Sequence, residues 1–296
     1  MSLYPDFREV ILETGNDASA FNNTVCYCAA RSMQNLAKAM GDYAQFEKAR
    51  NFADHIEGAF KKFYSEDLGF FASSTEATTC EPRLLPRHNA IKWENDYCAD
   101  LVMDKSKECV KFYEENLLCK AGIRPMPLWS ECYDADANQL SCWWPVMSEF
   151  FIRICNKENR KDLIDRYIKY VEYWSLRLMC PEGIPCNAET PNVPFDNWNC
   201  FCGIWHAYSV RGFYNAILHG YVGVNINQNG INFHPYEGEE VSVLGLNYGK
   251  RKFDINIKGS GTKIKNVTLN GKDLGAVNLI EFKDLCDNNI ITVTRG

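Results

Sequence analysis

Residues 19–42 read SAFNNTVCYCAARSMQNLAKAMGD, and this stretch sets the expectation for the fold. Its apolar side chains recur every three or four residues, at Cys26, Ala29, Met33, Leu36, Ala37 and Met40. That spacing predicts an amphipathic helix that begins after Ser19 and ends at Gly41-Asp42. The next stretch repeats the pattern, at Phe46, Ala49, Phe52, Ala53, Ile56, Phe60 and Phe63. Two long helices joined by a short turn predict an antiparallel helix hairpin.

Helical spacing continues to residue 222, with long interruptions. Further helices are predicted over about 99–119, 144–154, 160–179 and 198–222. The segments between them, 70–95, 121–141 and 181–197, contain prolines and polar residues and are predicted to be loops. Long loops that gather on one rim of a helical assembly are where we expect a functional site.

After Gly223 the spacing becomes alternating. Residues 254–258, Asp-Ile-Asn-Ile-Lys, place polar and apolar side chains in turn, and further strand candidates occupy 241–244, 264–269, 277–282 and 290–293. Short strands separated by glycine and asparagine turns predict a small antiparallel β-sandwich. The predicted fold class is therefore mainly α, with a helical domain at 1–222 and a C-terminal β-sandwich at 223–296. We expect the sandwich to pack on the helices rather than to bind a ligand.

The composition excludes several classes of protein. Lys and Arg number 32 against 38 Asp and Glu, and the resulting net charge of −6 is unlike the basic balance of nucleic-acid-binding proteins. No apolar run reaches the roughly 18–20 residues of a membrane span. The first residues have neither the basic start nor the apolar core of a signal peptide. We therefore expect neither a nucleic-acid partner nor a membrane partner.

The chain holds 14 cysteines. The favoured interpretation is that they are free thiols packed as small apolar side chains in the reducing cytoplasm, because a chain this long can bury a core without disulfides. Zinc binding is the alternative, carried by the C-x-C pairs Cys26-Tyr27-Cys28 and Cys200-Phe201-Cys202, but no C-x₂-C pair or histidine ligand spacing accompanies them. The sequence thus predicts a cytoplasmic protein with no metal and no cofactor.

All seven tryptophans lie between residues 93 and 205, and several fall in or beside the predicted loops. Aromatic rings stack on the apolar faces of sugars, while neighbouring carboxylates and amides bind the hydroxyls. The candidate sugar-binding residues are Trp93, Glu94, Asp96, Trp129, Glu131, Asp134, Trp143, Trp144 and Trp198. A core position is the alternative for Trp143, is favoured for Trp174 and Trp205, and fits Trp129 and Trp198 about as well as sugar binding does.

Five stretches of the chain resemble a known pattern. They are Phe21-Asn22-Asn23-Thr24 to Gly41-Asp42, Ala49 to Phe63, Tyr64 to Phe71, Cys142-Trp143-Trp144-Pro145, and Glu189 followed by Trp198, Gly203 and a helix to His219. In these stretches the sequence resembles the six-hairpin glycosidases, whose members include trehalase, the glucosidase I group, glucoamylase and the bacterial α-L-rhamnosidases. The resemblance implies an (α/α)6 toroid and an enzyme that hydrolyses glycosidic bonds, with carbohydrate as its substrate.

The number of helices departs from that pattern. A full toroid has six hairpins, whereas three are predicted here. The chain is therefore expected to be the C-terminal part of a longer enzyme, or a partial toroid that needs a partner to cover its exposed helix faces. That partner would be a second copy of the chain or the missing N-terminal portion of the same enzyme.

Glycoside hydrolysis needs two carboxyl groups, one that protonates the leaving oxygen and one that activates water or attacks carbon. The resemblance implies that Glu189 is the base of an inverting reaction, with Glu182 as its rival. Asp17, in Gly15-Asn16-Asp17-Ala18-Ser19, fits the acid of trehalase-like enzymes but also fits a helix cap.

Two other functions stay open. In a toroid-type phosphorylase, Arg83, Arg87 and His88 would bind phosphate, although a basic surface loop explains them equally well. In a non-catalytic carbohydrate-binding or assembly module, the aromatic platform would be kept without a paired acid and base.

Overall fold

The computed structural model describes residues 20–71, 101, 103–124, 127–129, 142–143, 145, 148–173, 184–185, 207–227 and 229–296. The chain divides into two compact units, each described by itself below. The first unit comprises Met1–Ile154 and Lys169–Phe213, and the second comprises Cys155–Ile168 and Tyr214–Gly296. Their boundaries fall inside three helices, α7 (Ser148–Lys157), α8 (Lys161–Val171) and α9 (Ala207–Asn215).

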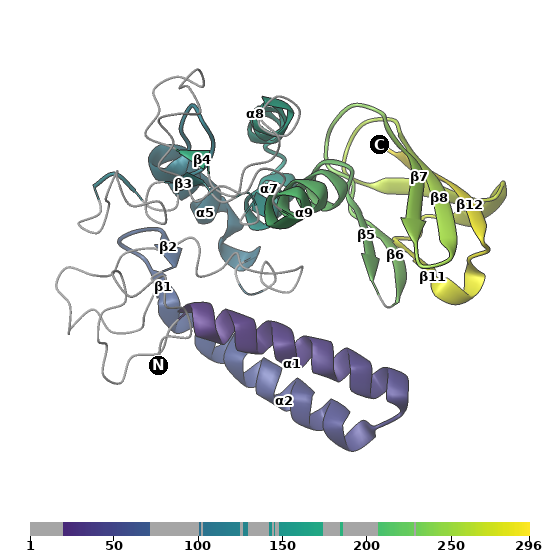
Figure 1. Ribbon diagram of the computed structural model, residues 1–296, viewed down its shortest axis with the longest axis horizontal. Helices are drawn as coiled ribbons and strands as arrows, with labels where there is room; N and C mark the ends of the chain where they lie inside the picture. Colours follow the sequence, from purple (N-terminus) through teal and green to yellow (C-terminus); the bar gives the residue numbers. More distant parts are fainter. Residues whose placement is uncertain are drawn as a thin grey trace. The chain divides into compact units, whose positions relative to one another are not determined.

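The first unit begins with the predicted hairpin, formed by α1 (Ala20–Met40) and α2 (Tyr43–Phe60) and drawn in purple and blue in Figure 1. Gly41 reverses the chain with a φ of 73°, which a glycine adopts without steric cost. Asp42 then caps α2, because its side chain accepts a hydrogen bond of 3.0 Å from the backbone N–H of Gln45. The turn residues that predicted the end of the first helix therefore also start the second.

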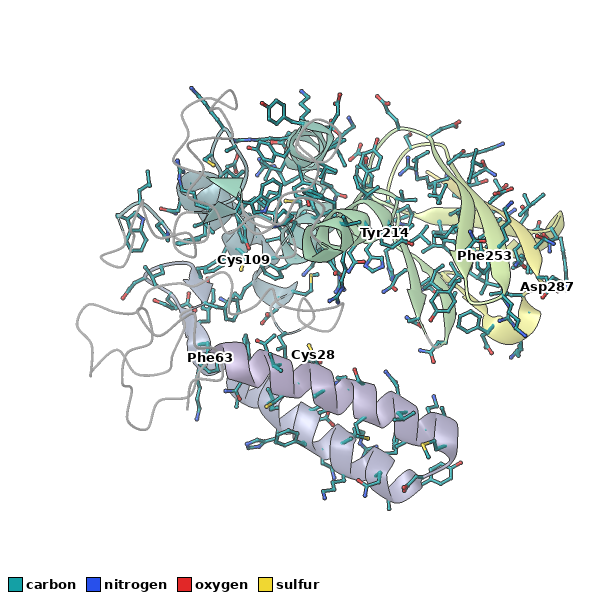
Figure 2. All side chains as sticks on the ribbon, in the orientation of Figure 1. Cys28, Phe63, Cys109, Tyr214, Phe253 and Asp287 are labelled. Carbon is teal, nitrogen blue, oxygen red and sulfur yellow. The ribbon has the colours of Figure 1, made fainter. Side chains whose placement is uncertain are left out.

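Small residues line the contact between α1 and α2. Ala30 and Ala37 on one helix and Ala49 and Ala53 on the other are all buried. Figure 2 labels Cys28 of α1 and Phe63 just beyond α2, both of which are also buried. Of the apolar stripe predicted for α1, Ala37 is buried, whereas Met33, Leu36 and Met40 are 50%, 54% and 74% exposed. Helical spacing therefore predicted the helix correctly, whereas tertiary packing decided which of its side chains are buried.

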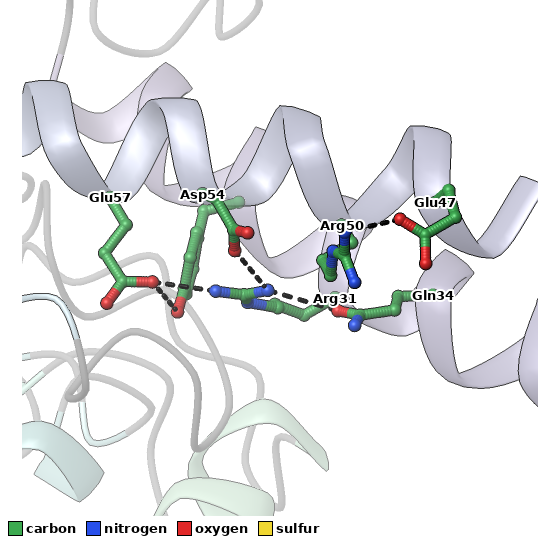
Figure 3. Close-up of polar contacts among 7 residues, drawn as sticks. Arg31, Gln34, Glu47, Arg50, Asp54 and Glu57 are labelled. Carbon is green, nitrogen blue, oxygen red and sulfur yellow. Dashed lines mark hydrogen bonds and ion pairs between the residues drawn. The ribbon is translucent and has the colours of Figure 1, made fainter.

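An ion-pair network ties α1 to α2 (Figure 3). The Arg31 guanidinium lies 2.9 Å from Asp54 Oδ1 and 2.7 Å from Glu57 Oε2, and it also donates to Gln34 Oε1. Burial by itself lowers the pKa of Arg31, but its contacts with Tyr27, Asp54 and Glu57 outweigh that effect and raise the pKa above its ordinary value. Both carboxylates are half exposed, so the network adds modestly to stability and chiefly sets the register of the two helices.

The rest of the first unit, as far as the structure describes it, consists of short elements. They are η2 (Lys61–Phe63), β1 (Tyr64–Ser65), β2 (Phe70–Phe71), η3 (Met103–Lys105), α5 (Ser106–Phe112), η4 (Tyr113–Leu117), β3 (Cys142–Trp143) and β4 (Ile184–Pro185). β1 pairs with β2, and β3 pairs with β4. Aromatic rings join these pieces, since Phe70 stacks on Phe112 at 4.5 Å and meets Tyr113 edge-on at 5.8 Å.

The second unit is built on two β-sheets. The strands are β5 (Val224–Asn227), β6 (Gly230–Phe233), β7 (Val241–Tyr248), β8 (Arg251–Lys258), β9 (Ile264–Leu269), β10 (Lys272–Gly275), β11 (Leu279–Glu281) and β12 (Asn288–Arg295), with two helical segments, η8 (Ala216–Tyr221) and η9 (Phe282–Asp284). One sheet has the order β10-β9-β12-β8-β7, and the other has the order β11-β6-β5. A single apolar core joins both sheets, because alternate residues of β8, β9 and β12 point into it together with Ile231, Phe233 and Ile280.

The prediction of a mainly α chain with an (α/α) toroid is wrong. The described residues form mixed α and β structure with four sheets. Among them, α1 and α2 are the two helices that pack together most extensively. The sandwich is also not purely antiparallel, because β12 runs parallel to β8 between β8 and β9. Sequence periodicity identifies helices and strands one at a time, but contacts between distant segments decide how they assemble.

The inward row of β12 begins and ends with a polar residue. Asn289, Ile291, Val293 and Arg295 are each no more than 3% exposed. Asn289 accepts from the N–H of Cys286 and donates to the carbonyls of Cys286 and Lys252. Arg295 donates to backbone carbonyls alone. Each end of the apolar row is thus closed by a side chain that satisfies buried backbone groups.

Tyr236 is buried near Arg295, and burial, reinforced by its interaction with Tyr221, raises its pKa well above the ordinary tyrosine value. A group whose pKa is raised on folding contributes stability below its unfolded pKa, near 10, and loses it as the pH rises further. We expect the free energy of unfolding to fall by about 1.4 kcal/mol per pH unit above about pH 10 because of this group.

Replacing Tyr236 with phenylalanine should remove that dependence. Urea unfolding of wild type and Tyr236→Phe, followed by far-ultraviolet circular dichroism from about pH 8 to about pH 11, measures it. Parallel decreases in the two proteins would contradict the assignment to Tyr236, since the other tyrosines and lysines titrate equally in both.

Candidate functional site

Most of the predicted catalytic, sugar-binding and phosphate-binding residues lie outside the part of the chain that the structure describes. These are Asp17, Glu182 and Glu189 among the catalytic candidates, and Trp93, Glu94, Asp96, Glu131, Asp134, Trp144 and Trp198 among the sugar-binding candidates, together with the phosphate candidates Arg83, Arg87 and His88. Their roles stay predictions. Trp129 and Trp143 are the nominated residues that the structure describes.

Trp143 lies in the core of the first unit. The residue is 1% exposed, and its Nε1–H donates a hydrogen bond of 3.1 Å to Ser148 Oγ. Its ring makes edge-to-face contacts with Tyr170 and Phe213, at centroid distances of 5.8 and 5.7 Å. A Cβ built on Gly122 would come within 2.2 Å of the indole ring, so the ring is also enclosed by that backbone. The structure therefore gives Trp143 a packing position, and a sugar could not reach its faces without opening the core.

Trp129 has the opposite environment. The residue is 52% exposed, and its Nε1–H donates a hydrogen bond of 2.8 Å to Asn116 Oδ1. Leu128 beside it is 56% exposed. Because the indole N–H is already bonded, the ring is held in one orientation while part of its surface stays open to solvent.

Asn116 is a rigid anchor for this ring. It belongs to η4, a π-helical segment that continues α5, and its Nδ2 donates to the carbonyl of Phe112 at 3.2 Å. Tyr113 and Leu117 on either side of it are fully buried. The segment therefore cannot rotate without disturbing the core, and π-helical turns of this kind occur often at functional sites.

The chain after η4 adds a second support. Leu118 and Ile123 form a β-bridge, and the N–H of Cys119 bonds to the carbonyl of Gly122 at 2.9 Å. The hydroxyl of Tyr170 donates to the carbonyl of Cys119. Hydrogen bonds thus hold the chain from Asn116 to Arg124, so the amide that accepts from Trp129 Nε1–H belongs to a well-supported segment.

Another polar cluster of the first unit is satisfied internally. Lys105 Nζ lies 3.4 Å from Glu66 Oε1 and 4.1 Å from the centre of the Tyr64 ring. Burial by itself lowers the pKa of Lys105, but its interactions with Tyr64, Glu66 and Glu108 together outweigh burial and raise the pKa above its ordinary value. Burial, with help from Glu108 and Asp104, raises the pKa of the Cys109 thiol, which keeps it protonated and unreactive. Neither group has the environment of a catalytic residue.

Metal binding has no structural support within the described part of the chain, where no three His, Cys, Asp or Glu side chains come together. Among the six cysteines whose side chains the structure describes, Cys28, Cys109, Cys119 and Cys155 are buried, and Cys26 and Cys286 are exposed. No helix among the described residues is both long enough and apolar enough to cross a membrane.

No protein-family model and no curated protein sequence matches the chain. Among solved structures, one described as a sialidase is similar to it, with a TM-score of 0.59 and 11% sequence identity. The similarity covers 93% of this chain and 26% of that chain, so this chain spans about a quarter of the length of the sialidase structure. At this identity the similarity shows a shared fold alone.

The sequence predicted Trp129 as a sugar-binding residue but gave no indication of its hydrogen-bond partner Asn116. Asparagine is a weak helix former, and its position inside the helix predicted over about 99–119 was the available signal. That signal marks a local irregularity and does not say which distant side chain the amide contacts.

Proposed function

We propose that this chain is part of a glycoside hydrolase and that Trp129 lies in its sugar-binding surface. The reaction would be hydrolysis of a glycosidic bond by general acid and base catalysis, with inversion at the anomeric carbon. Glu189 is proposed as the base that activates water, with Glu182 as its rival and Asp17 as a candidate acid. A carbohydrate is the proposed substrate.

The observation that carries the proposal is the state of Trp129. An indole ring that is half exposed loses hydration when it is covered, and a sugar ring presents a row of C–H groups that fits this flat surface. The hydrogen bond to Asn116 lowers the entropic cost, because the ring is already ordered before a ligand arrives. The fold shared with part of a sialidase supports a carbohydrate-active protein, although it names no substrate for this chain.

A non-catalytic carbohydrate-binding module is the second candidate. It is favoured by the finding that the chain spans only 26% of the similar structure, since a part of this size can hold a binding surface without a complete pair of carboxyl groups. Both candidates predict that Trp129 contributes to sugar binding. Only the hydrolase predicts that the bound sugar is cleaved.

Replacing Trp129 with alanine should weaken binding of a neutral oligosaccharide by about tenfold, because the stacking surface is lost. Replacing Asn116 with alanine should have a smaller effect in the same direction, since the ring remains but is no longer held. Isothermal titration calorimetry with glucose, galactose and rhamnose oligosaccharides measures both. Leu128→Ala is the matched control, because it removes an exposed apolar side chain next to Trp129 and leaves the ring in place.

Chromatography of any oligosaccharide that binds then separates the two candidates. Products formed by wild type, with a raised KM in Trp129→Ala, support the hydrolase. Binding that depends on Trp129 without any products supports the module. Equal oligosaccharide affinity in wild type and in a folded Trp129→Ala variant would contradict both the hydrolase and the binding module.

A further inference from the structure

Tyr248, Arg251 and Phe282 form a small surface at one end of the five-stranded sheet. Tyr248 and Arg251 face each other across the two-residue turn Gly249-Lys250 that joins β7 to β8. Phe282 is the first residue of η9. The three side chains come from parts of the second unit that the structure describes without a gap from 229 to 296.

The two aromatic rings are nearly parallel. Their centroids lie 5.7 Å apart with 14° between the planes, and Tyr248 is 43% exposed. Phe282 is half-buried and packs against the apolar core, so it supports one face of the Tyr248 ring. Tyr248 is thereby held in place while the rest of its surface stays open.

The Arg251 guanidinium completes the surface. Its Cζ lies 5.4 Å from the centre of the Phe282 ring, and the group makes no hydrogen bond or ion pair with the described residues. Its Nε is buried without a hydrogen-bond partner. This differs from Arg31, which meets two carboxylates, and from Arg295, which is surrounded by carbonyls. A guanidinium that is partly desolvated and makes no ion pair can bind an anion through its terminal Nη groups.

We propose that Tyr248, Phe282 and Arg251 form an accessory binding surface for an acidic sugar. The apolar face of the sugar would lie on Tyr248, and its carboxylate would accept a two-pronged hydrogen bond from Arg251. The proposal departs from the sequence-based expectation that the β region packs on the helices rather than binding a ligand. The inference rests on the proposed function only for sugar as the ligand class, because its surface shares no residue with the Trp129 surface.

Two probes that differ in one group test the proposal on the full chain, namely methyl glucuronide and methyl glucoside. Nitrogen-15 NMR spectra should show that the glucuronide shifts the amide signals of Gly249 and Lys250, and the glucoside should bind about tenfold more weakly because it lacks the carboxylate. Arg251→Lys should weaken the glucuronide by about tenfold and lose its preference over the glucoside. Tyr248→Ala should weaken both probes, whereas Tyr248→Phe should retain them.

Lys252→Ala is the matched control, since Lys252 is an exposed cation on the neighbouring position of β8. Thermal midpoints within a few degrees of wild type establish that each variant is folded. Equal affinity for the two probes, glucuronide binding that survives Arg251→Lys unchanged, or no shift at Gly249 and Lys250 would each overturn the proposal. Trp129→Ala should leave the glucuronide-induced shifts of Gly249 and Lys250 unchanged. A failure of the proposed Trp129 surface can therefore be distinguished from a failure of this one.

Discussion

Replacing Trp143 with alanine is expected to lower the free energy of unfolding of the first unit by about 3–5 kcal/mol. The indole is one of the largest fully buried side chains among the described residues, and its removal leaves a cavity between Tyr170 and Phe213. It also leaves the buried hydroxyl of Ser148 without the hydrogen bond that the indole N–H supplies. Both losses act in the same direction.

Trp129→Ala is the matched control, because it removes the same side chain from an exposed position and should cost less than about 1 kcal/mol. Urea unfolding by far-ultraviolet circular dichroism, with hydrogen exchange of the peptide that covers 148–154, measures the effect in the first unit. A Trp143→Ala variant as stable as Trp129→Ala would contradict the packing role. Loss of sugar binding at unchanged stability would favour a binding role instead.

Gly122 offers a further check on the same contact. A methyl group at this position would overlap the Trp143 ring, and the Gly122 backbone has a φ of 157°. Gly122→Ala should therefore be destabilising by about 1–3 kcal/mol in wild type. It should cost less in Trp143→Ala, where the cavity can accept the methyl group. Additive effects in the double variant would contradict a direct contact.

Replacing Arg295 with methionine is expected to lower the stability of the second unit by about 3 kcal/mol. The guanidinium donates to the carbonyls of Gly259 and Gly238 at 2.9 Å each, and also to those of Tyr236 and Glu239. These carbonyls belong to a loop and to the end of β8, so one side chain ties two separate parts of the fold to β12. Methionine fills much of the volume but leaves the buried acceptors without a donor.

Arg295→Lys should recover only part of the loss, because an ammonium group cannot reproduce the planar fork that meets carbonyls on several sides. Lys258→Met is the control, since it replaces an exposed cation on the neighbouring strand with the same residue. All seven tryptophans lie between residues 93 and 205, so their fluorescence does not follow this unit. Hydrogen exchange of peptides covering 236–240, 251–258 and 288–296 is the measurement. Unchanged protection in Arg295→Met would refute the proposed role.

Local features of the chain could be predicted from sequence where a single physical cause acts over a few residues. The hairpin of α1 and α2 follows from helical spacing on both sides of Gly41-Asp42, and the structure confirms it. The strand predicted over 264–269 matches β9 residue for residue, because alternation and a following Asn-Gly turn mark both of its limits. The strands β5, β6 and β10 were missed, since four-residue segments carry too little pattern.

The candidate site could be predicted only in part. An exposed position for Trp129 and a core position for Trp143 both fit the sequence, because a tryptophan serves equally well in a core and on a binding surface. The structure distinguishes the two residues by their burial. Trp143 is buried because it packs against Tyr170 and Phe213, which are distant from it in sequence. No sequence pattern predicted the surface proposed around Arg251, because it depends on the finding that this side chain has no hydrogen-bond or ion-pair partner among the described residues.

The sequence by itself determined the helices α1 and α2, the turn between them and the longer strands of the second unit, because each depends on neighbouring residues. The tertiary structure decided that alanines rather than Met33, Leu36 and Met40 line the helix pair, that β12 runs parallel to β8, and that Arg295 closes the core row. Those outcomes depend on contacts between residues far apart in the chain. The free energy of such contacts comes from shape and hydrogen-bond satisfaction, which periodicity does not encode.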